Sequence, residues 1–198
     1  MDQKPWEVCS DLQEDRLKFV ADIIRHVRRE SAALYNPEDG DGPWSLGCRN
    51  YERLINIIER ESHGKSWLSV KRKNNLGFWA FIGPVPIKFC KTDLMNASAE
   101  ALKINSDDPV YQPQNVFEFD ESTWHWRFII ETDEFGEALR IRIGQFTADG
   151  NVKNLHEIPM DDSAWGIIPT SKTLAEPVEI EKPKVSLKRV AKIINDEK

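Results

Sequence analysis

The sequence contains few cysteines, and none of them belongs to a pair. Cys9, Cys48 and Cys90 are odd in number, far apart and outside any Cys-x-x-Cys motif. This spacing excludes a disulfide framework and a cysteine-based zinc site, and it is typical of proteins from a reducing compartment. Long apolar runs are also missing: no segment approaches the roughly 18 apolar residues of a membrane span, and the first residues lack the apolar run of a signal peptide. We therefore expect a cytoplasmic protein without membrane contact.

Recognisable catalytic and metal-binding motifs are absent as well. The 4 histidines have no second ligand at a diagnostic spacing, so we expect no metal ion. The sequence has no Gly-x-Ser-x-Gly nucleophile motif and no glycine-rich phosphate loop, so we expect no cofactor. An enzyme whose site is assembled only in three dimensions stays open as an alternative.

Charge and aromatic content give weaker guidance. Lys and Arg number 27 against 33 Asp and Glu, which gives a net charge of −6. A dedicated nucleic-acid binder usually has an overall basic surface, so this balance argues mildly against one. The 7 Trp and 9 Phe residues predict a core built on aromatic side chains, some of which could serve an interface.

Two helices are predicted within residues 10–62, separated by a loop of turn-forming residues over 36–43. The first helix runs from Ser10 or Asp11 to about Tyr35. Its apolar residues recur at helical spacing and predict a buried stripe of Leu17, Val20, Ile24, Val27 and Leu34. The second helix runs roughly from Leu46 to Ser62, and its apolar side is Leu54, Ile55, Ile57 and Ile58.

A first antiparallel meander is predicted over residues 66–91. A tight turn that begins at Asn74 joins its first two strands and sets Leu68 opposite Phe81. The third strand follows a three-residue loop. We expect it to be an edge strand, because Pro86 cannot donate a ladder hydrogen bond.

A second meander is predicted over residues 114–158. Apolar and polar residues alternate along its strands, a pattern that indicates one buried face. Its three predicted turns put the apolar residues on one common face, with Trp126 opposite Ile143 and Ile141 opposite Ile158. A slip of one residue would invert a strand, so this agreement supports the sheet. Whether the two meanders form one sheet or two stays open.

The predicted architecture is α+β: two N-terminal helices packed on antiparallel β meanders of about seven strands, in a single domain over residues 1–168. A short helix up to about residue 103 connects the meanders. Residues 169–198 are expected to form an extended, proline-spaced tail that ends in a short basic amphipathic helix. Because so short a helix needs a surface to order it, we expect the tail to dock through Leu187, Arg189, Val190 and Ile194.

Arg127, Arg142 and His125 form the first candidate site, for an anion or an acidic partner. The predicted registers place Arg127 opposite Arg142 on the exposed face of the second meander, with His125 beside them. Two guanidinium groups that face each other favour binding of an anion. The alternative is a solvated face whose charge is neutralised by Glu157, which is predicted opposite Arg142.

Lys71, Arg72 and Lys73 form the second candidate site, on the first hairpin near Trp67. Basic residues beside an aromatic ring can grip phosphates and stack on bases. The alternative is that these side chains only protect a strand edge from aggregation.

For function, we expect a non-enzymatic interaction or regulatory protein that binds another macromolecule. Antitoxin-, immunity- and anti-defence-like regulators of bacteria and their mobile elements are typical of this class. The expectation depends on the missing catalytic motifs, the aromatic residues and the tail, and the expected partner is another protein. Two alternatives stay open: a nucleic-acid-associated protein that uses the basic hairpin and the helix arginines, and an enzyme or small-ligand binder. The oligomeric state is not indicated.

Overall fold

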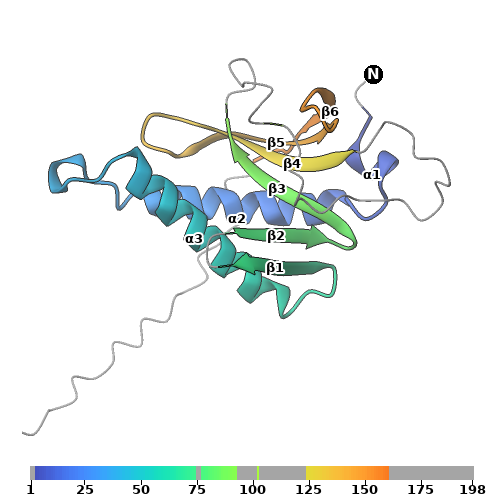
Figure 1. Cartoon of the computed structure of the whole chain (residues 1–198), viewed down its shortest axis with the longest axis horizontal. Coiled ribbons are helices and arrows are strands. Elements are labelled where there is room, and N and C mark those ends of the chain that lie inside the picture. The colour runs from blue at the N-terminus through green and yellow to red at the C-terminus, as the bar shows by residue number, and fades with distance from the viewer. Residues whose placement is uncertain (1–2, 75–76, 93–101, 103–123, 161–198) are drawn as a thin grey trace, which may run out of the picture. The chain divides into compact units, whose positions relative to one another are not determined.

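A single sheet joins the two predicted meanders. The computed structural model describes residues 3–74, 77–92, 102 and 124–160. In chain order, the elements in these residues are α1 (Pro5–Val8), α2 (Glu14–Ala32), the 3₁₀ helix η1 (Pro37–Asp39), α3 (Pro43–Ser62), β1 (Leu68–Asn74), β2 (Gly77–Ile82), β3 (Val85–Lys91), β4 (His125–Thr132), β5 (Ala138–Phe146) and β6 (Val152–Glu157). The strands form one sheet in the order β1-β2-β3-β4-β5-β6 (Figure 1).

The α+β class is confirmed, although the strand count and the strand directions differ from the prediction. The sheet has 6 strands within the described residues, where about seven were predicted. All neighbouring strands are antiparallel except β3 and β4, which are parallel. The predicted strand over 115–120, the boundary at residue 168 and the tail lie outside the described residues. None of the described helices is long and apolar enough to cross a membrane.

Helix α2 begins later and ends earlier than predicted. Gln13 occupies the N-cap position, and the acidic side chains of Glu14 and Asp15 in the first turn interact favourably with the helix dipole. The buried stripe is confirmed for four residues, each at most 2% exposed: Leu17, Val20, Ile24 and Val27. Leu34 is an exception, since the helix ends at Ala32 and Leu34 no longer follows the helical period.

Helix α3 begins at Pro43, earlier than predicted, because the fixed φ of proline suits the first helical position. The amide of Gly42 donates a hydrogen bond to Oγ of Ser45 (3.1 Å), which closes the start of the helix. Its apolar side is confirmed: Leu54, Ile55 and Ile58 are buried, and Ile57 packs half-buried against the core.

The register of β1 and β2 differs from the predicted one by one residue. Leu68 pairs with Ile82, where Phe81 was predicted. A β-bulge between Arg72 and Asn74 adds a residue to β1 and so sets the register of the pairs farther from the turn, from Leu68 to Arg72. As a result Leu68 and Ile82 face the core together, which the predicted register could not achieve for both.

Strand β3 is a central strand, so the prediction of an edge strand is wrong. Its connection to β2 is a turn of only two residues, in which Gly83 has φ +57° and Pro84 follows with the φ that its ring imposes. This combination is typical of a type II′ hairpin turn. Pairing with β4 begins at Ile87, so Pro86 precedes the parallel ladder and interrupts none of the pairs in it.

The β4–β5 register is shifted by two residues, which preserves the predicted faces. Phe128 pairs with Ile143, and Trp126 pairs with Gln145 where Ile143 was predicted. The shift arises because the turn is wider than predicted and because Leu139 forms a β-bulge opposite the step between Glu131 and Thr132. The β5–β6 register agrees with the prediction, with the amide of Ile158 bonded to the carbonyl of Ile141 (3.0 Å).

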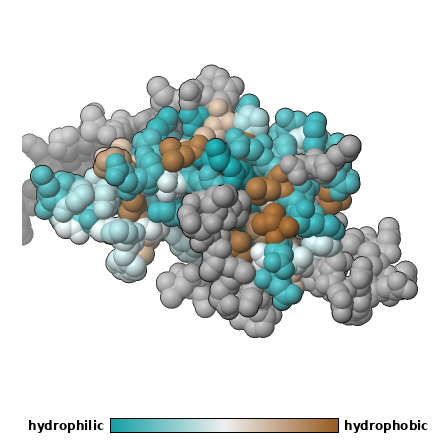
Figure 2. Space-filling view, turned by 90° about the horizontal axis from the view of Figure 1, so that it is seen from above, coloured by the Kyte–Doolittle hydropathy of each residue, from teal (hydrophilic) through white to brown (hydrophobic). Residues whose placement is uncertain are grey.

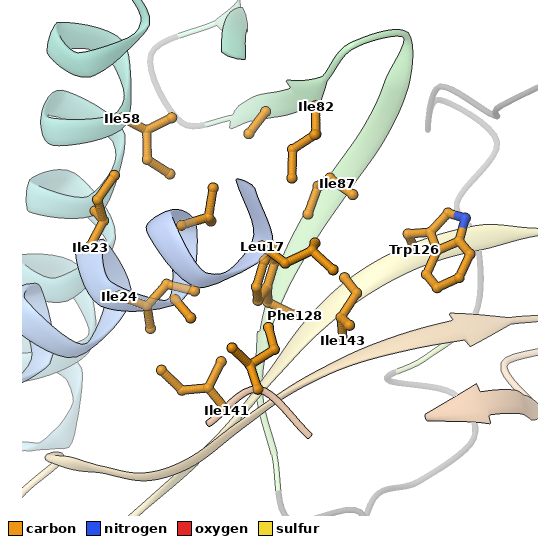
Figure 3. Packing of buried hydrophobic residues seen from close by; sticks show 14 of the residues in the cluster. Leu17, Ile23, Ile24, Ile58, Ile82, Ile87, Trp126, Phe128, Ile141 and Ile143 are labelled. Carbon is orange, nitrogen blue, oxygen red and sulfur yellow. The ribbon is translucent and has the colours of Figure 1, made fainter. Parts of the chain in front are cut away.

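One face of the sheet carries the main hydrophobic core, against which α2 and α3 pack (Figure 3). Side chains from both helices meet side chains from the five strands β1 to β5 in this layer. The residues labelled in Figure 3 are Leu17, Ile23, Ile24, Ile58, Ile82, Ile87, Trp126, Phe128, Ile141 and Ile143. The opposite face is also covered over β4, because Leu102 is buried there in a second cluster with Ile129 and Phe146.

Candidate functional site

Strand β4 has no exposed face, so the predicted exposure of the first candidate site is wrong. Every residue from His125 to Ile130 is buried, and both His125 and Arg127 are only 5% exposed. Arg127 pairs with Gly144 on β5, not with Arg142. The His125 ring stacks on Phe146 with centroids 5.6 Å apart. Both side chains are therefore part of the packed structure.

Arg142 lies closer to the surface than Arg127, and two carboxylates bind its guanidinium group. Its Nη1 donates to Oε1 of Glu131 (2.6 Å), and its Nε lies 3.5 Å from Oε2 of Glu157. Arg140 lies 3.3 Å from each of the same two carboxylates. The predicted pairing of Arg142 with Glu157 is confirmed. This network of two arginines and two glutamates favours the neutralised alternative. Anion binding at this site stays a prediction without geometric support.

Cys90 lies on the covered face of the sheet beside two cations. Lys88 is directly opposite Arg127 in the parallel pair of β3 and β4, and Cys90 follows two residues later on the same face. Burial raises the pKa of the Cys90 thiol, and the positive charges of Arg127 and Lys88 only oppose this effect. The thiol is therefore held protonated at neutral pH, which does not suit a nucleophile.

The second candidate site is divided between the two faces of the sheet. Lys71 is exposed, and its Nζ lies 5.3 Å from the ring centroid of Phe81. Arg72 points to the helical side, where its guanidinium forms an ion pair with Glu59 of α3. This hydrogen bond raises the pKa of Arg72 and lowers that of Glu59. The side chain of Lys73 lies outside the described residues. Lys71 and Arg72 therefore do not form one basic patch.

The tail residues Leu187, Arg189, Val190 and Ile194 lie outside the described residues. Within the described part of the chain, no group of three or more His, Cys, Asp or Glu side chains could hold a metal ion. None of the three cysteines forms a disulfide.

A set of large apolar residues is exposed that belongs to neither predicted site. Trp44 is 81% exposed in the first turn of α3, and Leu34 is 55% exposed just after α2. Phe135 in the β4–β5 turn is 56% exposed, and Leu139 at the start of β5 is 63% exposed. We call these four residues the end surface. The face seen in Figure 2 is mostly hydrophilic, with hydrophobic residues in separate patches.

Three chain segments meet where the end surface lies, at the first turns of α3. The β4–β5 turn lies against the beginning of α3 (Figure 1). A Cβ atom on Gly136 would lie 2.7 Å from Cδ2 of Leu46, so the two segments are in close contact. The segment after α2 is tied to the same helix, because Nη1 of Arg49 donates to the carbonyl of Leu34 (3.2 Å). The other guanidinium nitrogen of Arg49 contacts Asp41 (3.2 Å) in the loop between them.

Polar contacts fix the shape of the β4–β5 turn. Oδ1 of Asp133 accepts hydrogen bonds from the amides of Phe135 (3.0 Å) and Glu137 (2.8 Å). Gly136 completes the turn with φ +91°, a conformation that favours glycine. These hydrogen bonds stabilise the turn through its backbone amides. The turn therefore does not depend on burial of the Phe135 side chain, which is exposed to solvent.

Two features of the sequence could have indicated the end surface. Phe135 stands in a predicted turn between acidic residues, where a large apolar side chain has no strand or helix to bury it. Trp44 follows Pro43 directly at a helix start and precedes the apolar stripe of that helix. Leu34 and Leu139, by contrast, fit the helical and strand periods and were expected to be buried.

The comparisons with known proteins identify no relative: no protein-family model matches the chain, and neither a curated protein nor a solved structure is significantly similar to it.

Proposed function

We propose that the protein is a non-enzymatic interaction protein that binds another protein through the end surface. The single observation that carries this proposal is the exposure of Leu34, Trp44, Phe135 and Leu139 around the start of α3. Apolar side chains that gather on a monomer surface mark interaction sites, and tryptophan is enriched among the residues that dominate binding energy. Antitoxin-, immunity- and anti-defence-like regulators work by such contacts.

Two further observations support binding of a protein over binding of a nucleic acid. The basic hairpin is divided, since Arg72 is engaged by Glu59 on the helical side while Lys71 lies on the other face. Among the helix arginines, Arg16 lies 3.6 Å from a carboxylate oxygen of Asp11, and Arg28 is half-buried, so neither is fully presented to a ligand. The net charge of −6 adds to this argument.

The experiment compares what co-purifies with the intact chain and with two double variants in its native cells. Trp44→Ser with Phe135→Ser removes the most prominent part of the end surface. Val8→Ser with Val152→Ser is the matched control, because these valines are 41% and 48% exposed on α1 and β6. All four sites are exposed, so the melting temperature should stay close to that of the intact chain.

The proposal predicts that a protein recovered in near-stoichiometric amount with the intact chain and the control is lost from the Trp44→Ser, Phe135→Ser variant. Equal recovery from all three proteins would overturn it. Recovery of nucleic acid in a salt-sensitive manner, unchanged by the end-surface variant, would favour the nucleic-acid alternative.

A further inference from the structure

We propose that the segment bound at the end surface is basic: a stretch of a partner protein with apolar anchors flanked by Lys or Arg. This inference rests on the proposed function, because it gives the chemistry of the partner of the same surface. It is carried by the charge of the two turns that border the four apolar side chains.

The two bordering turns are acidic and contain no basic residue. They are residues 36–42, which precede α3, and residues 133–137, which join β4 to β5. Their acidic residues are Glu38, Asp39, Asp41, Asp133, Glu134 and Glu137. The contact between Gly136 and Leu46 brings the second turn against the helix that begins directly after the first.

Three of the six carboxylates already have structural partners. Asp41 forms an ion pair with Arg49 and accepts a hydrogen bond from the amide of Asn36 (3.0 Å). This backbone hydrogen bond is the largest cause that lowers the pKa of Asp41, and the bond from Ser45 adds to it. Asp39 accepts from Nδ2 of Asn36 (2.6 Å). Asp133 is bound to the amides of its own turn.

The other three carboxylates, Glu38, Glu134 and Glu137, are exposed and form no ion pair within the described part of the chain. They are not needed to hold either turn together. The basic residues that follow the two turns already have acidic partners. Arg49 pairs with Asp41, and Arg140 pairs with Glu131 and Glu157. The segments that carry the end surface therefore combine exposed apolar side chains with carboxylates that no cation in the described residues neutralises, and we take these carboxylates as its rim.

An apolar centre with a polar rim is the usual anatomy of a protein interface, and the rim charges select the partner. An acidic segment would bring like charges together at this rim. A neutral segment would take water away from the three glutamate carboxylates without supplying a positive charge. A basic segment would place Lys or Arg beside them, which speeds association and excludes wrong partners.

The test measures binding of three dye-labelled 14-residue peptides to the full chain by fluorescence anisotropy. All three have leucine at the same helical positions, and the other positions are all Lys, all Gln or all Glu. At low salt the Lys peptide should bind at least about tenfold more tightly than the Gln peptide, and the Glu peptide should bind least. The difference in affinity between the three peptides should decrease with added salt. The Debye length, over which exposed charges interact, falls from roughly 10 Å at 0.1 M to roughly 3 Å at 1 M salt.

Two variants with the same change in net charge locate the effect. Glu38→Gln, Glu134→Gln and Glu137→Gln together neutralise the rim. Glu14→Gln, Asp15→Asn and Asp149→Asn together are the matched control, because these residues are exposed at the start of α2 and in the β5–β6 turn. The rim variant should lose the preference for the Lys peptide, and the control should keep it. Circular dichroism checks that both variants are folded.

Each outcome decides a separate claim. Equal affinity for all three peptides, or equal loss in both variants, overturns the basic partner while leaving the end surface as a binding site. Peptide binding that survives Trp44→Ser with Phe135→Ser places the contact elsewhere and counts against the proposed function itself. A dimer, detected by sedimentation and dissociated by Trp44→Ser, would make a second copy the occupant and overturn the inference.

Discussion

Gly136 and Leu46 hold the β4–β5 turn against the beginning of α3. A Cβ atom on Gly136 would lie only 2.7 Å from Cδ2 of Leu46, and the Leu46 side chain is 5% exposed. The contact joins two segments that are 90 residues apart in the sequence. It also sets the position of Phe135 relative to Trp44, so the end surface depends on it.

Replacing this glycine should therefore cost more than replacing a glycine of equal backbone conformation. Gly136 and Gly40 have φ of +91° and +92°, but a Cβ on Gly40 would meet nothing within 4 Å. Gly40→Ala should lower the free energy of unfolding by about 1 kcal/mol, from backbone strain alone. Gly136→Ala should cost about 1–3 kcal/mol more, because the methyl group overpacks against Leu46. Chemical denaturation of both variants measures the difference.

A second substitution shows whether the extra cost comes from Leu46. Leu46→Ala removes the side chain that the new methyl group meets, so the two changes together should cost less than the sum of the separate costs. Additive costs in this double-mutant cycle would mean that the two residues do not touch in solution.

Two arginines on the same face of the sheet should respond differently to truncation. Arg127 is 5% exposed, whereas the side chain of Arg140 is 46% exposed in an ion pair with Glu131. Arg127→Ala should lower the free energy of unfolding by more than about 1 kcal/mol, as for a buried side chain. Arg140→Ala should cost about 0–1 kcal/mol, as for an exposed ion pair. If both variants lose equally little free energy of unfolding, Arg127 is exposed, as the sequence predicted.

The aromatic residue next to Arg127 should behave as a core residue. Trp126 is 3% exposed and belongs to the main core cluster. Trp126→Ala should cost about 3–5 kcal/mol, because it leaves a cavity that the surrounding side chains fill only in part. A cost below that of Arg140→Ala would contradict the assignment of faces on β4.

Stability should rise with pH in the range where His26 titrates. Burial lowers the pKa of His26 from 6.5; Glu30 opposes this effect and Arg29 adds to it. Below about pH 6.5 the unfolded state then binds more protons than the folded state, so the free energy of unfolding falls as the pH decreases through this window. His26→Gln should flatten the dependence between about pH 5 and 7 relative to the intact chain.

His63→Gln is the matched control, since His63 is exposed at the end of α3. It should leave the pH dependence of the intact chain in place. An unchanged slope in His26→Gln, or the same change in both variants, would mean that His26 is not the group responsible.

The periodicity of the sequence was sufficient to predict the buried stripes and most faces, because burial of apolar side chains decides them. Leu17 and Ile24 on α2, and Phe128 and Ile141 in the sheet, lie where their spacing predicts. The registers were predicted less well. They depend on bulges such as the one at Leu139 and on turn lengths, which local hydrogen bonds decide.

The candidate sites could not be predicted, for two physical reasons. Arg127 follows the polar period of β4, but the cluster that contains the buried Leu102 covers that face. Strand β4 is also paired in parallel with β3, and parallel strands are commonly buried on both faces. Leu34 and Leu139 follow apolar periods, but a helix end and a bulge turn them into solvent. The hydrophobic period alone does not show at which residue a helix or strand ends.

The central claim, that the end surface binds a partner protein, is tested most directly by site-specific photo-cross-linking in the native cells. The residue p-benzoylphenylalanine replaces Trp44 or Phe135 in two test proteins and Val8 or Val152 in two controls, all at exposed positions. We predict that the same partner protein is cross-linked from positions 44 and 135 and not from positions 8 and 152. A partner cross-linked only from the control positions, or from all four equally, would contradict the claim.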